Sequence, residues 1–265
     1  MNLYTIKRQF ERIGARAKVD INSRRFGGTV SIDVGNDGKG EFFDIDISQD
    51  DASDLRVVDS QPRIRHLLLL SEQSDGKHKF LCGHDERHWF VAAVPERASV
   101  TNVRTAFEVL KPEAVHLRQN ELNVKPRKRN RRRNVAFIRQ GEWFFVPLPT
   151  DQPIDEKLIF RNEPLRRRRG KPHHCQELVR QGGELVYVSP QHPNGLTEVQ
   201  FGKLMNRKPK LRHLPWLAQR RNPGVFVRGK VRHADHKTIV LDGWHQVLMN
   251  TETESVAMRH VAFID

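Results

Sequence analysis

Alternation of apolar and polar residues indicates β-strands along much of the chain. Residues 29–34 and 42–47 both alternate in this way, and the segment from Gly35 to Gly38 between them is rich in turn-forming residues. The two segments therefore predict a β-hairpin. Further apolar runs predict strands at residues 55–58, 66–70, 79–81 and 89–94.

Helical spacing of apolar residues marks two short segments of the first half. Leu3, Ile6, Phe10 and Ile13 recur at three- and four-residue intervals, and Gly14 follows them as a helix-ending residue. A second helix is expected over residues 99–110, because Val103, Ala106, Phe107 and Leu110 share one face and Pro112 follows.

The second half mixes strands with two predicted helices. Its strands are expected at residues 136–139, 143–148, 157–160, 185–188, 225–232, 237–241, 246–249 and 260–264. Pro172 suits the first turn of a helix that would run to about Arg180. A second helix is expected over residues 194–205, where Thr197 and Gln200 form a capping box.

These elements predict an α+β fold, mostly antiparallel sheet with a few short helices, arranged in two units. The expected division is a near-neutral α+β domain at residues 1–118, a basic linker at 119–134, and a basic β-rich domain at 135–265. The C-terminal domain is expected to be small, with its strands in a barrel or a meander. Whether the halves are separate domains or share one continuous sheet stays open.

Charge is divided unequally between the halves. Residues 1–118 contain 18 Lys and Arg and 18 Asp and Glu, whereas residues 119–265 contain 28 basic and 14 acidic residues. The net charge of +14 therefore lies entirely in the second part. Such an excess is typical of a protein that binds a polyanion. An anionic membrane surface is a weaker partner, because no long basic amphipathic helix is present.

Nucleic acid is the expected partner, and RNA is favoured over DNA because no helix-turn-helix pattern is visible. Arg-rich clusters suit phosphate binding, since a guanidinium group can contact a phosphate with two parallel hydrogen bonds. The neutral half would contact other proteins, which makes the chain a subunit of a larger complex. The predicted phosphate-binding residues are Lys125, Arg127, Lys128, Arg129, Arg131, Arg132, Arg133, Arg166, Arg167, Arg168, Arg169, Lys171, Arg207, Lys208, Lys210 and Arg212.

An alternative function is a metal-dependent nuclease or other phosphodiesterase. His233 and His236 flank a predicted two-residue turn at Ala234 and Asp235, which would bring the two imidazoles together across a hairpin. Asp235 and His245 are the other candidate ligands, for a divalent ion such as zinc or manganese. Without this site, no cofactor is expected. A further alternative is a non-enzymatic protein whose basic half binds an acidic partner.

Cysteine content and the lack of a leader favour the cytoplasm. The first ten residues lack the apolar stretch of a secretory signal, and two cysteines cannot build a disulfide framework. Cys175, at the start of the predicted helix after Pro172, and Cys82, in a polar turn, are weak candidates for a nucleophile. The chain contains no P-loop, H-E-x-x-H, C-x-x-C or G-x-S-x-G motif.

Overall fold

The computed structural model describes residues 3–21, 30–47, 55–73, 76–96, 99–149, 152–167 and 171–254. These residues form an α+β fold dominated by antiparallel sheet, which confirms the predicted fold class. In the same ranges, no helix is long and apolar enough to cross a membrane.

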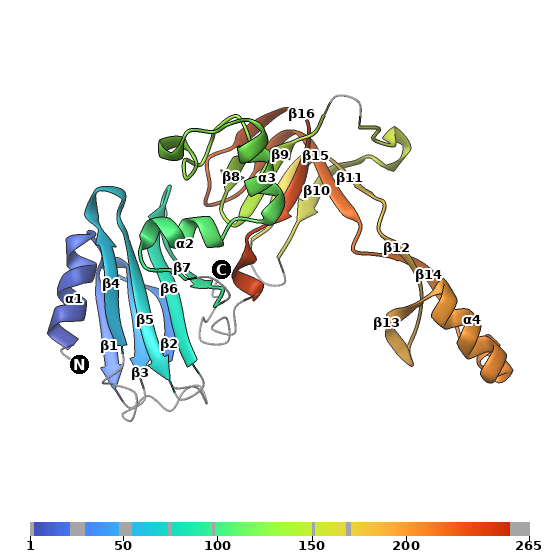
Figure 1. The fold of residues 1–265 in the computed structure, drawn as a ribbon, viewed down its shortest axis with the longest axis horizontal. Helices are drawn as coiled ribbons and strands as arrows, with labels where there is room; N and C mark the ends of the chain where they lie inside the picture. Colours follow the sequence, from blue (N-terminus) through green and yellow to red (C-terminus); the bar gives the residue numbers. More distant parts are fainter. Residues whose placement is uncertain are drawn as a thin grey trace.

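The first half consists of two sheets that pack face to face (Figure 1). One sheet has the order β1-β3-β2, where β1 is Ala17–Ile21, β2 is Val30–Asp37 and β3 is Gly40–Ile47. The other has the order β4-β5-β6-β7, with β4 at Leu55–Gln61, β5 at His66–Gln73, β6 at Gly76–Asp85 and β7 at His88–Val94. The pairing is antiparallel except between β1 and β3. Helix α1, Leu3–Arg12, packs into the same core through Ile6 and Phe10, as predicted.

The central strand β5 is covered on both faces, which explains its uninterrupted run of leucines. Leu67 and Leu69 point into the core between the two sheets, whereas Leu68 packs with helix α2, Val103–Val109, on the opposite face. Successive side chains of a strand point to opposite faces, so a strand buried on both sides needs apolar residues throughout.

Parts of the segment predicted as the basic linker, residues 119–134, have regular structure. Its first residues complete helix α3, Glu113–Glu121, and the 3₁₀ turn η3, Pro126–Lys128, lies within it. Gln119 is fully buried, and its Nε2 donates a hydrogen bond to the Arg129 carbonyl at 2.8 Å. Helix α3 was missed because it lacks an apolar stripe of regular spacing. The division into domains itself stays a prediction.

The second half is built on a six-stranded antiparallel sheet of order β10-β11-β15-β16-β9-β8. It is an open sheet with β10 and β8 at its edges. Its strands are β8 at Ile138–Gln140, β9 at Trp143–Pro147, β10 at Phe160–Leu165, β11 at His173–Gln181, β15 at Gly224–Arg232 and β16 at Ile239–Met249. Strand β9 alternates between two cores, since Phe145 packs with β11, β15 and β16 while Phe144 packs with α3.

Three local predictions in the second half are corrected. Residues 173–181 form strand β11 instead of a helix, because Cys175 and Leu178 fill the core of the sheet. Residues 156–158 form the 3₁₀ turn η4, Glu156–Leu158, and the strand follows it. The strands expected at 237–241 and 246–249 are parts of one strand, β16. The strand expected at 260–264 lies outside the described residues.

A small arm projects from this sheet between β11 and β15 (Figure 1). It contains a three-stranded sheet of order β13-β12-β14, with β12 at Glu184–Ser189, β13 at His192–Thr197 and β14 at Leu217–Arg221. Helix α4, Glu198–Arg207, and the 3₁₀ helix η5, Pro209–His213, complete it. The predicted capping box of Thr197 and Gln200 is confirmed, as the Thr197 hydroxyl accepts from the Gln200 N–H at 3.3 Å.

Ion pairs at the β6–β7 turn join the two halves. Asp85 in this turn forms ion pairs with Arg132 and with Arg139, the latter at 3.4 Å. Glu86 pairs with Arg132 at 3.0 Å and accepts the backbone N–H of Lys237 at 2.8 Å. At the other end of the chain, the turn η6, Thr251–Glu254, reaches back to helix α2.

Replacing Leu69 with alanine should destabilise the protein by about 2–5 kcal/mol, because it leaves a cavity in a strand that is buried on both faces. Val58→Ala, at a residue that is 38% exposed on β4, should change stability by less than about 0.5 kcal/mol. Chemical denaturation of both variants measures the difference. Equal stabilities would contradict the described core.

Candidate functional site

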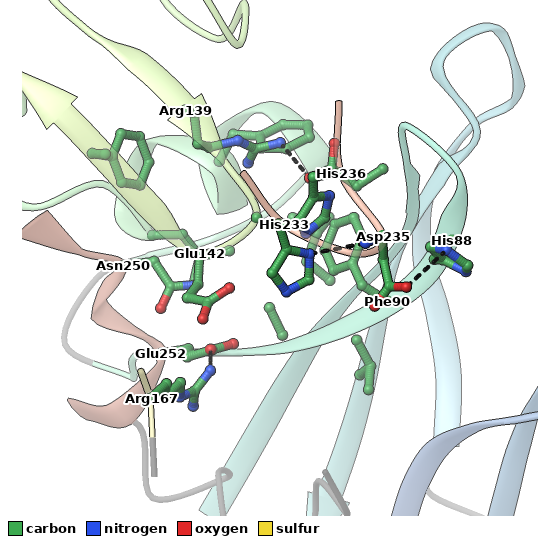
Figure 2. A pocket seen from close by; sticks show the side chains of 18 of the residues that line it. His88, Phe90, Arg139, Glu142, Arg167, His233, Asp235, His236, Asn250 and Glu252 are labelled. Carbon is green, nitrogen blue, oxygen red and sulfur yellow. Dashed lines mark hydrogen bonds and ion pairs between the residues drawn. The ribbon is translucent and has the colours of Figure 1, made fainter. Parts of the chain in front are cut away.

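A cavity of about 210 Å³ lies where the two halves meet. Figure 2 shows that residues of both halves line it, with His88 and Phe90 of β7 on one side and Glu142, Asn250 and Glu252 on another. His233 and His236, from the loop between β15 and β16, project into it. Apolar walls with a few convergent polar groups are typical of ligand sites.

Three histidines converge at this cavity. His173 begins β11, and its neighbour strand β15 ends just before His233 and His236, so the sheet brings the three together. Their potential ligand atoms lie within 4.8 Å of one another. The imidazole rings are stacked, with centroids 4.2 Å apart for His173 and His233 and 4.7 Å apart for His233 and His236.

Of the four predicted metal ligands, the structure brings His233 and His236 together and adds His173. Residues 233–238 form a longer loop than the predicted two-residue turn, yet the two histidines still meet. Asp235 is engaged by the Lys171 ammonium group at 2.9 Å. His245 lies within β16 opposite Pro147 and is not part of the group.

His173 and His236 favour their neutral form. Burial, followed by the charges of His233 and His236, lowers the pKa of His173 to about 3. Burial and His233 also lower the pKa of His236. Stacked imidazoles cannot all take up protons without strong repulsion, so these two rings hold free lone pairs at neutral pH.

A buried carboxyl group faces the same cavity. Glu252 is 3% exposed and pairs with Arg167. Burial raises the pKa of Glu252 to about 7, although Arg167 acts in the opposite direction. A carboxyl group with a pKa near neutral can donate or accept a proton under physiological conditions.

The first basic cluster is divided between outward and inward roles. Arg132 neutralises Asp85 and Glu86, and Arg129 donates to Val124 and Asn120. These two are half-buried and hold the fold together. The exposed members are Lys125, Arg127, Lys128, Arg131 and Arg133.

Two of the three described residues of the second basic cluster are used within the protein. Arg167 pairs with Glu252 and Lys171 with Asp235, whereas Arg166 is exposed. Arg168 and Arg169 lie outside the described residues. The cluster precedes strand β11 instead of the predicted helix, so no helix N-terminus lies there to assist anion binding.

The third cluster lies on the arm and faces outward. Residues 184–221 contain seven Lys and Arg against two Glu. All four predicted residues of this cluster, Arg207, Lys208, Lys210 and Arg212, are exposed. A groove of about 550 Å³ beside them is lined by Phe201, Gly202, Met205, Asn206, Arg212, Leu214 and Trp216.

Aromatic side chains of the second half are candidates for stacking on bases, but three of them are buried in the cores. Phe144 and Phe145 are buried in the two cores that flank β9, and Trp143 is buried with Phe145. Trp244 is half-buried under the Arg228 guanidinium, 4.7 Å from its ring centre. Trp216 is half-buried on the arm, where its Nε1 donates to the Leu211 carbonyl at 2.9 Å.

Neither cysteine has the environment of a nucleophile. Cys82 and Cys175 are both fully buried within strands. Burial raises the pKa of the Cys175 thiol to about 12 and raises that of Cys82 further. A thiol must ionise to attack a substrate, so these two residues serve the core.

Comparison with known proteins yields no match: no family model, no curated protein and no solved structure is similar to the chain at a significant level. The geometry of the described residues therefore carries the functional argument.

Sequence reasoning missed three residues of the cavity in these roles. His173 was placed near a helix start, which concealed its pairing with the strand that precedes His233. Glu252 lies far from the histidines in sequence and carries no local signal. Arg167 was assigned to phosphate, although its partner is Glu252. The adjacent His173 and His174 were the only available hint.

Replacing Glu252 with glutamine should change how stability depends on pH. The folded wild type holds this proton up to about pH 7, whereas the ordinary value is 4.5. The protonated Glu252 therefore contributes fully to the free energy of unfolding below pH 4.5. This contribution, about 3 kcal/mol, is lost as the pH rises from 4.5 through 7. Relative to wild type, the Glu252→Gln variant should gain stability over this window.

Denaturation at a series of pH values measures this difference, and the exposed Glu156→Gln variant is the control. A constant difference between wild type and Glu252→Gln across the window would show that the carboxyl group titrates normally.

Proposed function

We propose that the protein is a cytoplasmic nucleic-acid-binding protein that holds single-stranded RNA in preference to DNA, as a subunit of a larger complex. The observation that carries the proposal is the exposed basic arm, residues 184–221. Its seven Lys and Arg residues against two Glu give it a net charge of +5. Contacts with phosphates supply affinity without requiring a particular base sequence.

The position of the arm supports this proposal. The arm projects from the six-stranded sheet, so a nucleic-acid strand could contact it without colliding with the rest of the protein (Figure 1). Only Arg221 among its basic residues has a recorded ion pair, with Glu184, and the other six extend the positive surface. Basic side chains without nearby carboxylates exert a stronger attraction on a polyanion.

The groove beside Trp216 provides a site for bases. Phe201, Met205 and Leu214 line it together with Arg212. Trp216 and Phe201 contact each other edge to face, with ring centres 5.0 Å apart. An apolar groove next to a cation suits an unstacked base whose phosphate stays outside, and this arrangement favours single strands over a duplex.

Neutralising three of these charges should weaken binding and reduce its dependence on salt. The variant combines Lys208→Gln, Lys210→Gln and Arg212→Gln. Loss of three phosphate contacts should reduce the log–log salt slope on single strands by about 2. Fluorescence anisotropy with labelled single-stranded RNA, single-stranded DNA and duplex DNA, each over a salt series, measures the slope and the preference.

A matched control removes the same number of charges from helix α1, with Lys7→Gln, Arg8→Gln and Arg12→Gln, all exposed. It should leave the slope nearly unchanged. Equal losses in the two variants would point to a diffuse effect of net charge. No binding of wild type at low salt would refute the proposal and leave an acidic protein as the partner of the basic half.

A second candidate function is a metal-dependent phosphodiesterase. The observation favouring it is that Glu252 and the three histidines line one cavity. Histidine ligands would hold an ion that activates water, and Glu252 would transfer a proton.

If this candidate is correct, labelled RNA or DNA should be cleaved in the presence of zinc or manganese. Glu252→Gln should reduce the rate by about 100-fold or more, since general acid–base catalysis contributes that much. Gel analysis of the products measures the rate, with Glu156→Gln as the control. Full activity of Glu252→Gln would exclude a role for this residue, and no cleavage by wild type with either ion would exclude the candidate.

A further inference from the structure

We propose that His173, His233 and His236 bind a divalent transition-metal ion, with zinc as the expected ion. The proposal concerns these three side chains alone and does not depend on nucleic-acid binding. It changes the ligand set expected from the sequence, because His173 takes the place of His245 and Asp235.

Proximity is the first argument. The potential ligand atoms lie within 4.8 Å of one another. Three nitrogens bound to zinc at about 2.0–2.1 Å in a tetrahedral arrangement are about 3.4 Å apart. Closing the remaining difference needs shifts of about 1 Å or less per side chain, which rotation of an imidazole about its Cβ–Cγ bond can supply.

The buried nitrogens give the second, independent argument. His173 is 2% exposed, and its Nε2 is buried with no hydrogen-bond partner among the described residues. Nδ1 of His236 is likewise buried without a hydrogen-bond partner among the described residues, and the Glu86 carboxylate lies 3.7 Å from it. A buried polar atom without a partner costs about 1–3 kcal/mol. Coordination of a metal ion would remove this cost at both atoms.

The surroundings of His233 resemble those of a metal ligand. Its Nε2 lies 3.1 Å from the carbonyl oxygen of Lys171, and its Nδ1 accepts the Asp235 N–H at 3.1 Å. With the proton on Nε2, His233 donates to a backbone carbonyl, which is the usual outer partner of a metal-binding histidine. Nδ1 is then the nitrogen available to the ion. It would give up the hydrogen bond that it accepts from the Asp235 N–H when the ion binds.

The three imidazole rings are stacked, so their orientation must change when a metal ion binds. The ring planes are inclined by only 24–28° to one another, whereas lone pairs directed at one ion require the rings to converge. Gly141 leaves space next to His236, since a Cβ atom there would lie 3.0 Å from its Nε2. We therefore expect the rings to turn when the ion binds, with little movement of the backbone.

The ligand chemistry selects the class of ion. Three imidazoles favour zinc, copper, nickel or cobalt over magnesium and calcium, which prefer oxygen ligands. The nearby carboxylates are already engaged, Asp235 by Lys171 and Glu86 by Arg132. Three protein ligands leave one position of a tetrahedral zinc ion for water.

The test uses the full chain, freed of metal with a chelator and titrated with zinc chloride at pH 7.5. Calorimetry and the metal content after desalting should give one zinc per chain, and magnesium should not compete. His173→Ala, His233→Ala and His236→Ala should each weaken binding by more than the roughly 10- to 100-fold that an outer partner contributes. The control is His213→Ala, an exposed residue of η5.

Two measurements keep the test independent of folding defects. Circular dichroism without metal shows whether each variant is folded, and His233→Ala, in a loop, is the least disruptive of the three. Cobalt(II) in place of zinc should give the strong visible absorption of a four-coordinate site, lost in that variant. Absence of zinc binding by folded wild type, or loss in His245→Ala with retention in His173→Ala, would overturn the proposal.

Discussion

The carboxylates of the β6–β7 turn hold the two halves of the protein together, and the cavity depends on this contact. Asp85 and Glu86 bind the guanidinium groups of Arg132 and Arg139, and Glu86 also accepts the N–H of Lys237 in the histidine loop. These groups are partly buried, so salt screens their attraction less than it screens surface pairs. The turn belongs to a rigid hairpin of the first half, and it therefore fixes the loop that carries His233 and His236.

The same contact changes the meaning of the charge distribution. The first half is neutral as a whole, yet it supplies the anions that compensate Arg132 and Arg139 of the second half. Arg167 and Lys171 are compensated inside the second half by Glu252 and Asp235. Four basic residues of this part of the chain thus stabilise the junction and the cavity. The arm, with two carboxylates against seven basic residues, keeps its positive charge at the surface, and the nucleic-acid proposal rests on this region.

The cavity and the arm have different chemistry, and the fold separates them. The cavity combines three clustered histidines with a carboxyl group whose pKa is raised by burial to about 7. The arm exposes permanent positive charges beside an apolar groove. Binding a polyanion on the arm and holding a metal ion in the cavity are compatible, because they use no residue in common. Whether one supports the other depends on the path of a bound strand.

Local pattern determined the strands and helices whose apolar faces repeat regularly. Helix α1, the β2–β3 and β8–β9 hairpins and the Thr197 cap follow from spacing and turn residues alone, because those signals are local. Residues 173–181 did not follow, since Pro172 favours a helix start while the sheet required Cys175 and Leu178 in its core. His233 and His236 could be paired from their spacing. Only the tertiary structure added His173 and Glu252 and removed Arg132 and Arg167 from the exposed charges, because strand pairing and burial bring together residues that are distant in sequence.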